Sequence, residues 1–172
     1  MERLSAESLL LLARSETDGA AREPVDLDAA MCRAFAPFAG SLERRHVSIR
    51  HDASSNGGVI ATAVPALVER VAADLASNAA AYATPGSTVE VETSVAGDRV
   101  RVTVANDCEP LPADAAERAF EPFWRADAAR TDQGVHAGLG LALVRSCVEA
   151  MDGDAAIDAS ANRFEISVAL PR

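Results

Sequence analysis

A glycine-rich segment near the end of the chain offers phosphate chemistry. The stretch Gly134-Val135-His136-Ala137-Gly138-Leu139-Gly140-Leu141 runs into a helix expected over residues 139–151. The first amides of a helix have no partner within it and lie at the positive end of its dipole, so they bind phosphate oxygens. Glycines let a phosphate approach the backbone, although they serve ordinary turns equally well. The segment therefore needs supporting groups elsewhere before it predicts a site.

One helix face carries such groups. Asp74, Asn78 and Tyr82 follow one another at four-residue steps, so in a helix their side chains share one face. Polar groups on a face that meets a sheet need partners. A magnesium ion that bridges Asn78 to triphosphate oxygens would supply one, because Mg²⁺ takes oxygen ligands and keeps several waters. A hydrogen bond from Asn78 to a neighbouring backbone group is the alternative.

Composition restricts the class of protein. The 172-residue chain has a formal net charge of −10 and a pI of about 4.7, which disfavours nucleic-acid binding because that depends on Lys and Arg. The three cysteines are far apart and suggest neither a zinc site nor disulfides. No apolar run approaches the roughly 20 residues of a membrane-spanning helix. We expect one cytoplasmic domain without membrane contact of its own.

The periodicity of apolar residues predicts the elements that hold these groups. The expected helices are residues 27–45, 65–83 and 139–151. The expected strands are residues 47–51, 59–64, 88–95, 99–106, 155–158 and 163–170. Asp26 is placed to cap the first helix, and Pro37 to kink or break it. Glycines in residues 54–58 suit a tight turn between the first two strands, and residues 96–98 close a hairpin.

Residues 107–137 show no sustained periodicity. A loop of that length inside a small domain is usually functional, and we interpret it as a lid. The order of helices and strands implies an α+β fold, a two-layer α/β sandwich in which about three helices cover one face of a mixed sheet. A pocket is expected between the helices and the lid.

Four segments resemble, in order, the motifs of the ATP-binding catalytic domain of bacterial two-component sensor histidine kinases, a Bergerat-type fold. Residues 74–82 resemble the N-box, residues 104–112 the first glycine box, residues 120–125 the F-box and residues 138–141 the second glycine box. Residues 9–14 resemble the end of a dimerisation helix, and residues 24–27 the start of the catalytic domain. The resemblance implies a division into residues 1–23, a helix end plus linker, and residues 24–172, the catalytic domain.

The resemblance also implies ATP and Mg²⁺ as cofactors and gives roles to single residues. Asn78 coordinates Mg²⁺ with help from Asp74, Asn106 meets the adenine amine and Tyr82 flanks the adenine. Arg125 and Arg130 are similar to arginines that approach the γ-phosphate, where fixed charge assists phosphoryl transfer; a solvated surface charge is the alternative for each. The other implied nucleotide contacts are Leu111, Gly134, His136, Gly138, Leu139 and Gly140. The aromatic residues Phe120, Phe123 and Trp124 would anchor the lid on apolar surface.

The sequence departs from the family pattern at several positions. Asn106 stands where Asp is usual, which should weaken adenine binding by about 1 kcal/mol. Cys108 and Pro110 replace glycines, and a positive φ at either would cost about 1–3 kcal/mol. Asp74 replaces an Asn, and related serine kinases use a Glu there as general base.

The histidines of the sequence indicate whether the phosphate acceptor lies within it. None of His46, His51 and His136 lies in a segment that resembles the phosphoacceptor box. We therefore expect the γ-phosphoryl group to reach a histidine of a separate or missing phosphoacceptor domain, and through it a response regulator. The chain would then be cytoplasmic, or the cytoplasmic part of a membrane-bound sensor. A degenerate pseudokinase that serves protein contacts and an anti-sigma-type serine kinase that uses Asp74 as base are the alternatives.

Overall fold

A computed structural model describes residues 20–53, 58–126, 138–160 and 162–172 of the chain. The strands are β1 (Glu23–Asp26), β2 (Ser48–Ala53), β3 (Ile60–Ala63), β4 (Thr88–Ala96), β5 (Arg99–Asp107), β6 (Asp154–Ser160) and β7 (Arg163–Pro171). The helices are α2 (Leu27–Phe35), α3 (Ala39–Arg44), α4 (Pro65–Tyr82), α5 (Ala115–Arg118) and α6 (Gly140–Ala150), with a 3₁₀ turn at Ala36–Phe38.

Five strands form one mixed sheet in the order β2-β4-β5-β7-β6. The predicted hairpin is confirmed, since β4 and β5 pair antiparallel with Val91 opposite Val104. β5 pairs antiparallel with β7, and Asn106 lies opposite Phe164. β2 joins the edge in parallel to β4, which requires a crossover connection of the kind that α4 supplies.

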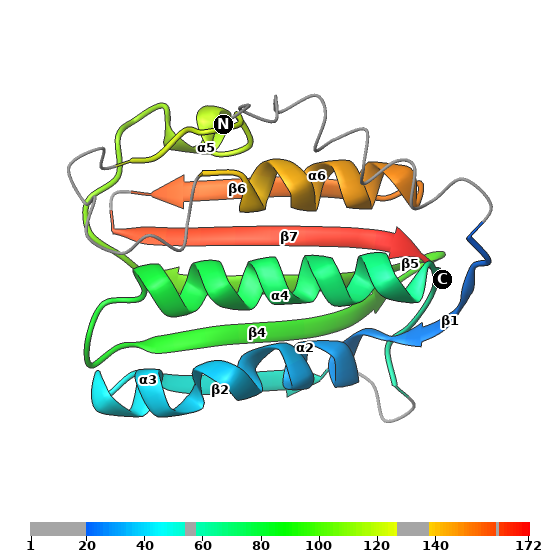
Figure 1. Ribbon diagram of the computed structural model, residues 1–172, viewed down its shortest axis with the longest axis horizontal. Coiled ribbons are helices and arrows are strands. Elements are labelled where there is room, and N and C mark those ends of the chain that lie inside the picture. Colours follow the sequence, from blue (N-terminus) through cyan, green and yellow to red (C-terminus); the bar gives the residue numbers. More distant parts are fainter. Residues whose placement is uncertain (1–19, 54–57, 127–137, 161) are drawn as a thin grey trace, which may run out of the picture.

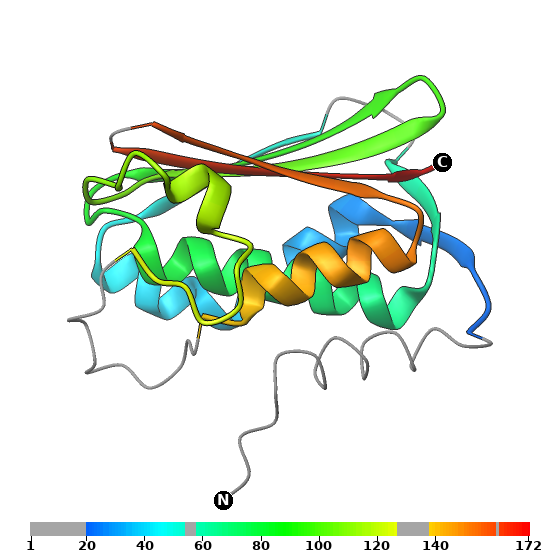
Figure 2. The ribbon, with the colours of Figure 1, turned by 90° about the horizontal axis from the view of Figure 1, so that it is seen from above.

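The helices α2, α4 and α6 cover one face of this sheet (Figures 1 and 2), as the two-layer prediction required. Alternate strand residues point to this face because side chains in a strand alternate between its two sides. The core therefore contains the inward side chains of β4, β5 and β7 together with the apolar face of α4. Its largest fully buried members include Met31, Leu67, Leu75, Val89, Val91, Val100, Val104, Ile166 and Leu170.

The first helix starts and breaks where the sequence predicts. Asp26 caps it by accepting a hydrogen bond from the amide of Ala29 at 3.1 Å. Pro37 lies in the 3₁₀ turn that separates α2 from α3, because a proline ring has no amide hydrogen and cannot continue an α-helical ladder.

The expected turn between the first two strands does not join a hairpin. β3 pairs antiparallel with β1, with Ile60 opposite Asp26, and the two form a sheet of their own. β2 instead belongs to the main sheet. The short strand β1 was not predicted, because four residues carry too little alternation to show a strand.

The predicted N-terminal helix and most of the predicted linker fall in residues 1–19, outside the described residues, whereas Glu23, the last residue of the predicted linker, begins β1. The domain boundary after residue 23 thus stays a prediction. In the part of the chain that the structure describes, no helix combines the length and apolar character that crossing a membrane would need.

Candidate functional site

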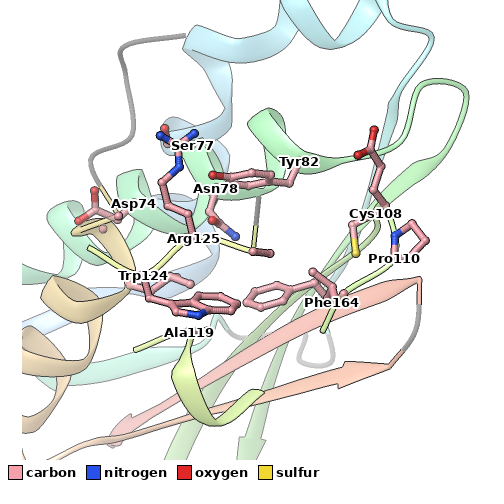
Figure 3. A pocket seen from close by; sticks show the side chains of 16 residues that line it. Asp74, Ser77, Asn78, Tyr82, Cys108, Pro110, Ala119, Trp124, Arg125 and Phe164 are labelled. Carbon is pink, nitrogen blue, oxygen red and sulfur yellow. The ribbon is translucent and has the colours of Figure 1, made fainter. Parts of the chain in front are cut away.

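A pocket of about 160 Å³ opens between α4, the loop after β5, residues 119–126 and the start of α6 (Figure 3). Residues 119–126 are the described part of the expected lid beyond that loop and are called the lid segment. The pocket lies where the sequence analysis expected one. The described residues that line it are Asp74, Ser77, Asn78, Tyr82, Cys108, Glu109, Pro110, Leu111, Ala119, Trp124, Arg125, Ala126, Gly138, Gly140, Leu141 and Phe164.

One wall is a face of α4. The helix buries Leu67, Val71 and Leu75 against the sheet, and this packing fixes its rotation. Asp74, Asn78 and Tyr82 then line the pocket together, as their four-residue spacing predicted. Figure 3 shows Asn78 and Tyr82 on the side opposite the rings of Trp124 and Phe164. The pocket therefore has a polar wall facing an apolar one.

Asp74 connects this wall to the start of α6. Its carboxylate forms an ion pair with Arg70, one turn earlier on α4, with Nε and Oδ2 2.7 Å apart. Gly140 lies so close that a Cβ there would be 3.7 Å from Asp74 Oδ1. The close approach of α4 and α6 places the Asp74 carboxylate beside the first amides of α6.

The start of α6 has the features of an anion site. The residue at its N-cap is Leu139, whose side chain cannot accept a hydrogen bond from the first amides. Gly138 and Gly140, on either side of it, both line the pocket. Amides at the positive end of an eleven-residue helix can therefore bind an anion that enters the pocket.

Gly138 is held against the lid. Its φ is +71°, in the left-handed region that favours glycine. A Cβ at this position would lie 2.8 Å from the carbonyl carbon of Phe123 and from the carbonyl oxygen of Trp124. The carbonyl of Gly138 accepts a hydrogen bond from the amide of Phe123 at 2.7 Å. Only glycine fits this contact between the lid and α6.

The lid aromatics behave in two different ways. Phe120 and Trp124 pack against the core, and arginines cover their rings: Arg145 lies 5.5 Å from the ring of Phe120, and Arg118 lies 5.8 Å from the ring of Trp124. Phe123 is 55% exposed, so the expectation that it packs on apolar surface is wrong. Its φ of +68° turns the side chain outward, and its backbone makes the contact instead.

The loop after β5 keeps the pocket open without backbone strain. Cys108 and Pro110 both line the pocket. Among the described non-glycine residues, positive φ angles occur at His46, Phe123 and Asp152, so neither substituted position has the strained conformation that would penalise it. The amide of Cys108 donates to the carbonyl of Asn162 at 2.9 Å. The backbone strain expected from Cys108 and Pro110 is therefore absent, and these residues affect the pocket through their side chains alone.

The remaining predicted residues have different positions. Arg125 and Leu111 line the pocket, and the Arg125 side chain extends from the lid toward α4 (Figure 3). Asn106 is 2% exposed and is not among the lining residues; its Nδ2 donates to the carbonyl of Asp107 at 3.1 Å. It lies on β5 beside Phe164, which does line the pocket. Leu139 follows Gly138 at the helix start.

Three predicted residues, Arg130, Gly134 and His136, lie outside the described residues. The structure adds pocket residues that the sequence analysis did not select, among them Ser77 and Phe164. Phe164 had a partial signal in the alternation of apolar residues along the predicted strand 163–170, but only the structure shows that it pairs with Asn106 and reaches the pocket. Ser77 carried no signal beyond its place beside Asn78.

The donors in the pocket suit a hard cation held mostly by a ligand. Asn78 offers an amide oxygen, and Asp74 offers a carboxylate whose Oδ2 also contacts Arg70. Two oxygen donors are too few for an all-protein cage but fit Mg²⁺, which is usually bound by one or two side chains plus phosphates and waters. Asp74 and Glu109 make the lining partly acidic, so a polyanion would need such a cation and the α6 amides.

Comparison with known proteins gives a consistent set of matches. A family model for the histidine kinase-, DNA gyrase B- and HSP90-like ATPases matches residues 63–172. The sensor protein CutS of Streptomyces coelicolor is 34% identical over 151 residues, which cover 87% of this chain and 36% of CutS. The sensor histidine kinase CusS of Escherichia coli K12 is 35% identical over 106 residues, 60% of this chain and 22% of CusS. The chain thus spans about a third or less of these relatives.

Solved structures share the fold. The catalytic domain of the histidine kinase ThkA, in a nucleotide-free form, superposes with a TM-score of 0.74 at 18% identity and covers 87% of this chain and 95% of its own. Full-length ShkA in complex with AMPPNP gives a TM-score of 0.73 at 23% identity, over 98% of this chain and 35% of ShkA. At such identities the likeness establishes the architecture, a mixed sheet with helices on one face.

Proposed function

Because the chain belongs to the histidine kinase-, DNA gyrase B- and HSP90-like ATPase family, we propose that it binds Mg-ATP in this pocket and donates the γ-phosphoryl group to a histidine of a phosphoacceptor domain. Relatives over most of its length are named sensor proteins and sensor histidine kinases, which favours this branch of the family. The structurally similar ShkA was solved with AMPPNP, an ATP analogue.

The observation that carries the proposal is the placement of Asn78 across from the α6 helix start in one pocket. The amides that follow Gly138 would bind phosphate oxygens, and Asn78 would hold the magnesium ion with Asp74 nearby. Bound there, the ion would neutralise charge on the transferring phosphate. The adenine would enter the part of the pocket lined by Tyr82, Leu111 and Phe164.

Arg125 is the described arginine placed to act on the γ-phosphate. It lines the pocket and extends toward the wall that carries Asn78 (Figure 3). A guanidinium keeps its charge at any physiological pH and stabilises the negative oxygens of a transferring phosphoryl group. Arg130 keeps its proposed supporting role.

The acceptor would come from another domain. Of the described histidines, His46 lies in the exposed turn after α3 and His51 lies on β2, and neither lines the pocket. A histidine on a separate phosphoacceptor domain would therefore receive the phosphoryl group and pass it to a response regulator.

Two observations favour this function over the alternatives from the sequence. Oδ2 of Asp74 is already paired with Nε of Arg70 at 2.7 Å, so this oxygen is engaged by a cation and not presented to a substrate hydroxyl, which disfavours Asp74 as the general base of a serine kinase. The unstrained backbone at Cys108 and Pro110 leaves the pocket open, which disfavours a module that has lost nucleotide binding.

The activity test uses ATP radiolabelled on its γ-phosphate. With Mg²⁺, the chain alone should gain no label, whereas an added phosphoacceptor domain from a sensor histidine kinase should become labelled. The product should be stable in base and labile in acid, as phosphohistidine is. Labelling of the chain itself, or an acid-stable and base-labile product, would reject this acceptor assignment.

The binding test is independent of the acceptor. Trp124 is the sole tryptophan of the sequence and lines the pocket, so its fluorescence should change as Mg-ATP is added. Asn78→Ala should weaken Mg-ATP binding at least tenfold and remove its dependence on Mg²⁺. The control is Asn162→Ala, because Asn162 is exposed and contributes a backbone carbonyl. Equal affinities for the two variants would exclude Asn78 from the metal site.

A further inference from the structure

A polar cluster lies where α2 crosses the edge strand β2, the region at the bottom of Figure 1. Asp28 and Cys32 are one turn apart on α2, and His51 lies on β2. The Sγ atom of Cys32 is 3.3 Å from Nδ1 of His51, and Nε2 of His51 is 2.8 Å from Oδ1 of Asp28. These three residues are not among those that line the nucleotide pocket.

The imidazole of His51 is fixed by its neighbours, but one of its ring nitrogens lacks a well-aligned hydrogen bond within the described residues. Among the residues that the structure describes, its Nε2 has no aligned hydrogen-bond partner and is shielded from solvent, although Asp28 Oδ1 is close. That carboxylate oxygen accepts a hydrogen bond from the hydroxyl of Thr93 at 3.0 Å, and Thr93 is fully buried. A hydrogen-bonded carboxylate beside an imidazole is typical of metal ligands and the groups that orient them.

The local charge favours a cation over a reactive thiol. Partial desolvation by neighbouring atoms and the carboxylates of Asp28 and Asp26 raise the pKa of the exposed Cys32 thiol, which disfavours a free nucleophilic thiolate and means that a bound ion has to displace the thiol proton. The same carboxylates attract a positive ion. The positive charge of the neighbouring Arg33 opposes the attraction of a cation, but its guanidinium pairs with Glu69 at 2.5 Å.

We propose that Asp28, Cys32 and His51 bind one zinc ion, or another divalent transition metal of similar preference, through one atom each. The three candidate ligand atoms all lie within 4.8 Å of one another. With bond lengths of about 2.3 Å to sulfur and 2.1 Å to nitrogen, tetrahedral geometry places those two ligands about 3.6 Å apart, and Cys32 and His51 are close to that spacing. Binding breaks the thiol S–H bond, and the proton goes to solvent.

The exposed side of the cluster leaves room for a fourth ligand. Cys32 is exposed, so a water molecule would complete the tetrahedron, as in zinc sites with three protein ligands. The ion would also link α2 to the edge strand. The sequence analysis saw no zinc spacing because the ligands come from two elements that only the fold brings together.

The test uses the full chain with Co²⁺ as a spectroscopic substitute, in reducing buffer with excess Mg²⁺ to occupy oxygen sites. A thiolate-to-cobalt charge-transfer band should grow to a stoichiometry of one ion per chain and disappear on addition of Zn²⁺. Cys32→Ser should abolish the band, and His51→Asn should weaken binding at least tenfold. The matched controls Cys108→Ala and Cys147→Ala should keep it. A band that survives Cys32→Ser, or its absence from the unmodified chain, would overturn the proposal.

A second measurement guards against misfolded variants. Zn²⁺ should raise the thermal unfolding temperature of the unmodified chain, because an ion that binds the folded state stabilises it. The Cys32→Ser variant should unfold at the temperature of the metal-free chain and show no rise with Zn²⁺. An equal rise in this variant would place the ion elsewhere and reject the site. Mg-ATP binding should be the same in both proteins, which separates this test from that of the proposed function.

Discussion

The amide of Phe123 donates a hydrogen bond of 2.7 Å to the carbonyl of Gly138, and both residues have positive φ angles, +68° and +71°. This pair joins the lid segment to the start of α6. Any side chain at position 138 would collide with the backbone of Phe123 and Trp124. The shape of the helix start, and hence the direction of its amides, depends on this contact.

Replacing Gly138 by alanine should therefore weaken nucleotide binding more than tenfold. The left-handed conformation alone costs an L-residue about 1–2 kcal/mol, and the collision forces the lid or α6 to move. Trp124 fluorescence with added Mg-ATP measures the affinity. Gly86→Ala is the matched control, because Gly86 has a φ of +80° but open space around it. A similar affinity in both variants would contradict the role of the contact.

Asn106→Asp should strengthen ATP binding and weaken the fold. Position 106 lies behind the pocket, beside the lining residue Phe164, so a carboxylate there would have to turn toward the pocket to accept the adenine amine, and the charge-assisted bond would then be worth about 1 kcal/mol or fivefold in affinity. The substitution also removes the Nδ2 donor that binds the Asp107 carbonyl and buries a charge. Calorimetric titration with ATP and GTP, together with urea unfolding, checks both effects. A gain for GTP equal to that for ATP would show that Asn106 does not contact the adenine.

Arg45 should stabilise the end of α4 that carries Tyr82. Its guanidinium donates to the carbonyl of Ala80, at 2.5 Å, in the last turn of α4 and to the carbonyl of the C-cap residue Ala83, at the end of the helix where carbonyls lack helical partners. Arg45→Ala should lower the free energy of unfolding by about 2–3 kcal/mol and reduce ATP affinity. Urea unfolding provides the measurement, with Arg44→Ala, an exposed neighbour on α3, as control. A loss in both variants of the same size would point to a general charge effect.

Glu90 should make stability depend on pH. The hydrogen bond from Arg163, with the charges of Arg163 and Arg50, lowers the pKa of Glu90. A lowered folded-state pKa stabilises the fold above the ordinary glutamate value of about 4.3 and loses that contribution as the pH falls through the folded-state value. Glu90→Gln should cost about 0.5–1 kcal/mol at pH 7, the range of exposed ion pairs.

The pH test of this pair compares thermal unfolding of Glu90→Gln and the unmodified chain from pH 7 into the acid range. The gap should close at acid pH and shrink at high salt, because both conditions weaken the ion pair. Glu92→Gln, on the same strand, is the control. A gap that stays constant with pH would show that the charge of Glu90 is not what stabilises the sheet.

Local signals predicted most of the fold. Pro65 in the first turn of α4 and the spacing of apolar residues along this eighteen-residue helix defined it, and turn residues defined the β4–β5 hairpin. The parallel pairing of β2 with β4 and the β1–β3 sheet were not predicted, since both join segments that are distant in sequence. Local patterns carry no information about such partners.

The part of the candidate site that lies on one helix was predictable from the sequence, whereas the part that depends on contacts between distant segments was not. The spacing of Asp74, Asn78 and Tyr82 placed one wall of the pocket, because helical periodicity fixes a shared face. The outward side chain of Phe123 was not predictable, since it follows from a positive φ imposed by the contact with Gly138. The ion pair between Arg70 and Asp74 could be expected from their four-residue spacing on a helix. It engages one oxygen of the carboxylate that was considered as a general base.

The N-cap of α6 also affects the local stability of the helix. Leucine at that position cannot satisfy the helix amides, so an anionic ligand that binds them completes the secondary structure of the protein. Ligand binding should therefore stabilise the first helical turn, and the resistance of this turn to hydrogen exchange should rise and fall with the concentration of free nucleotide.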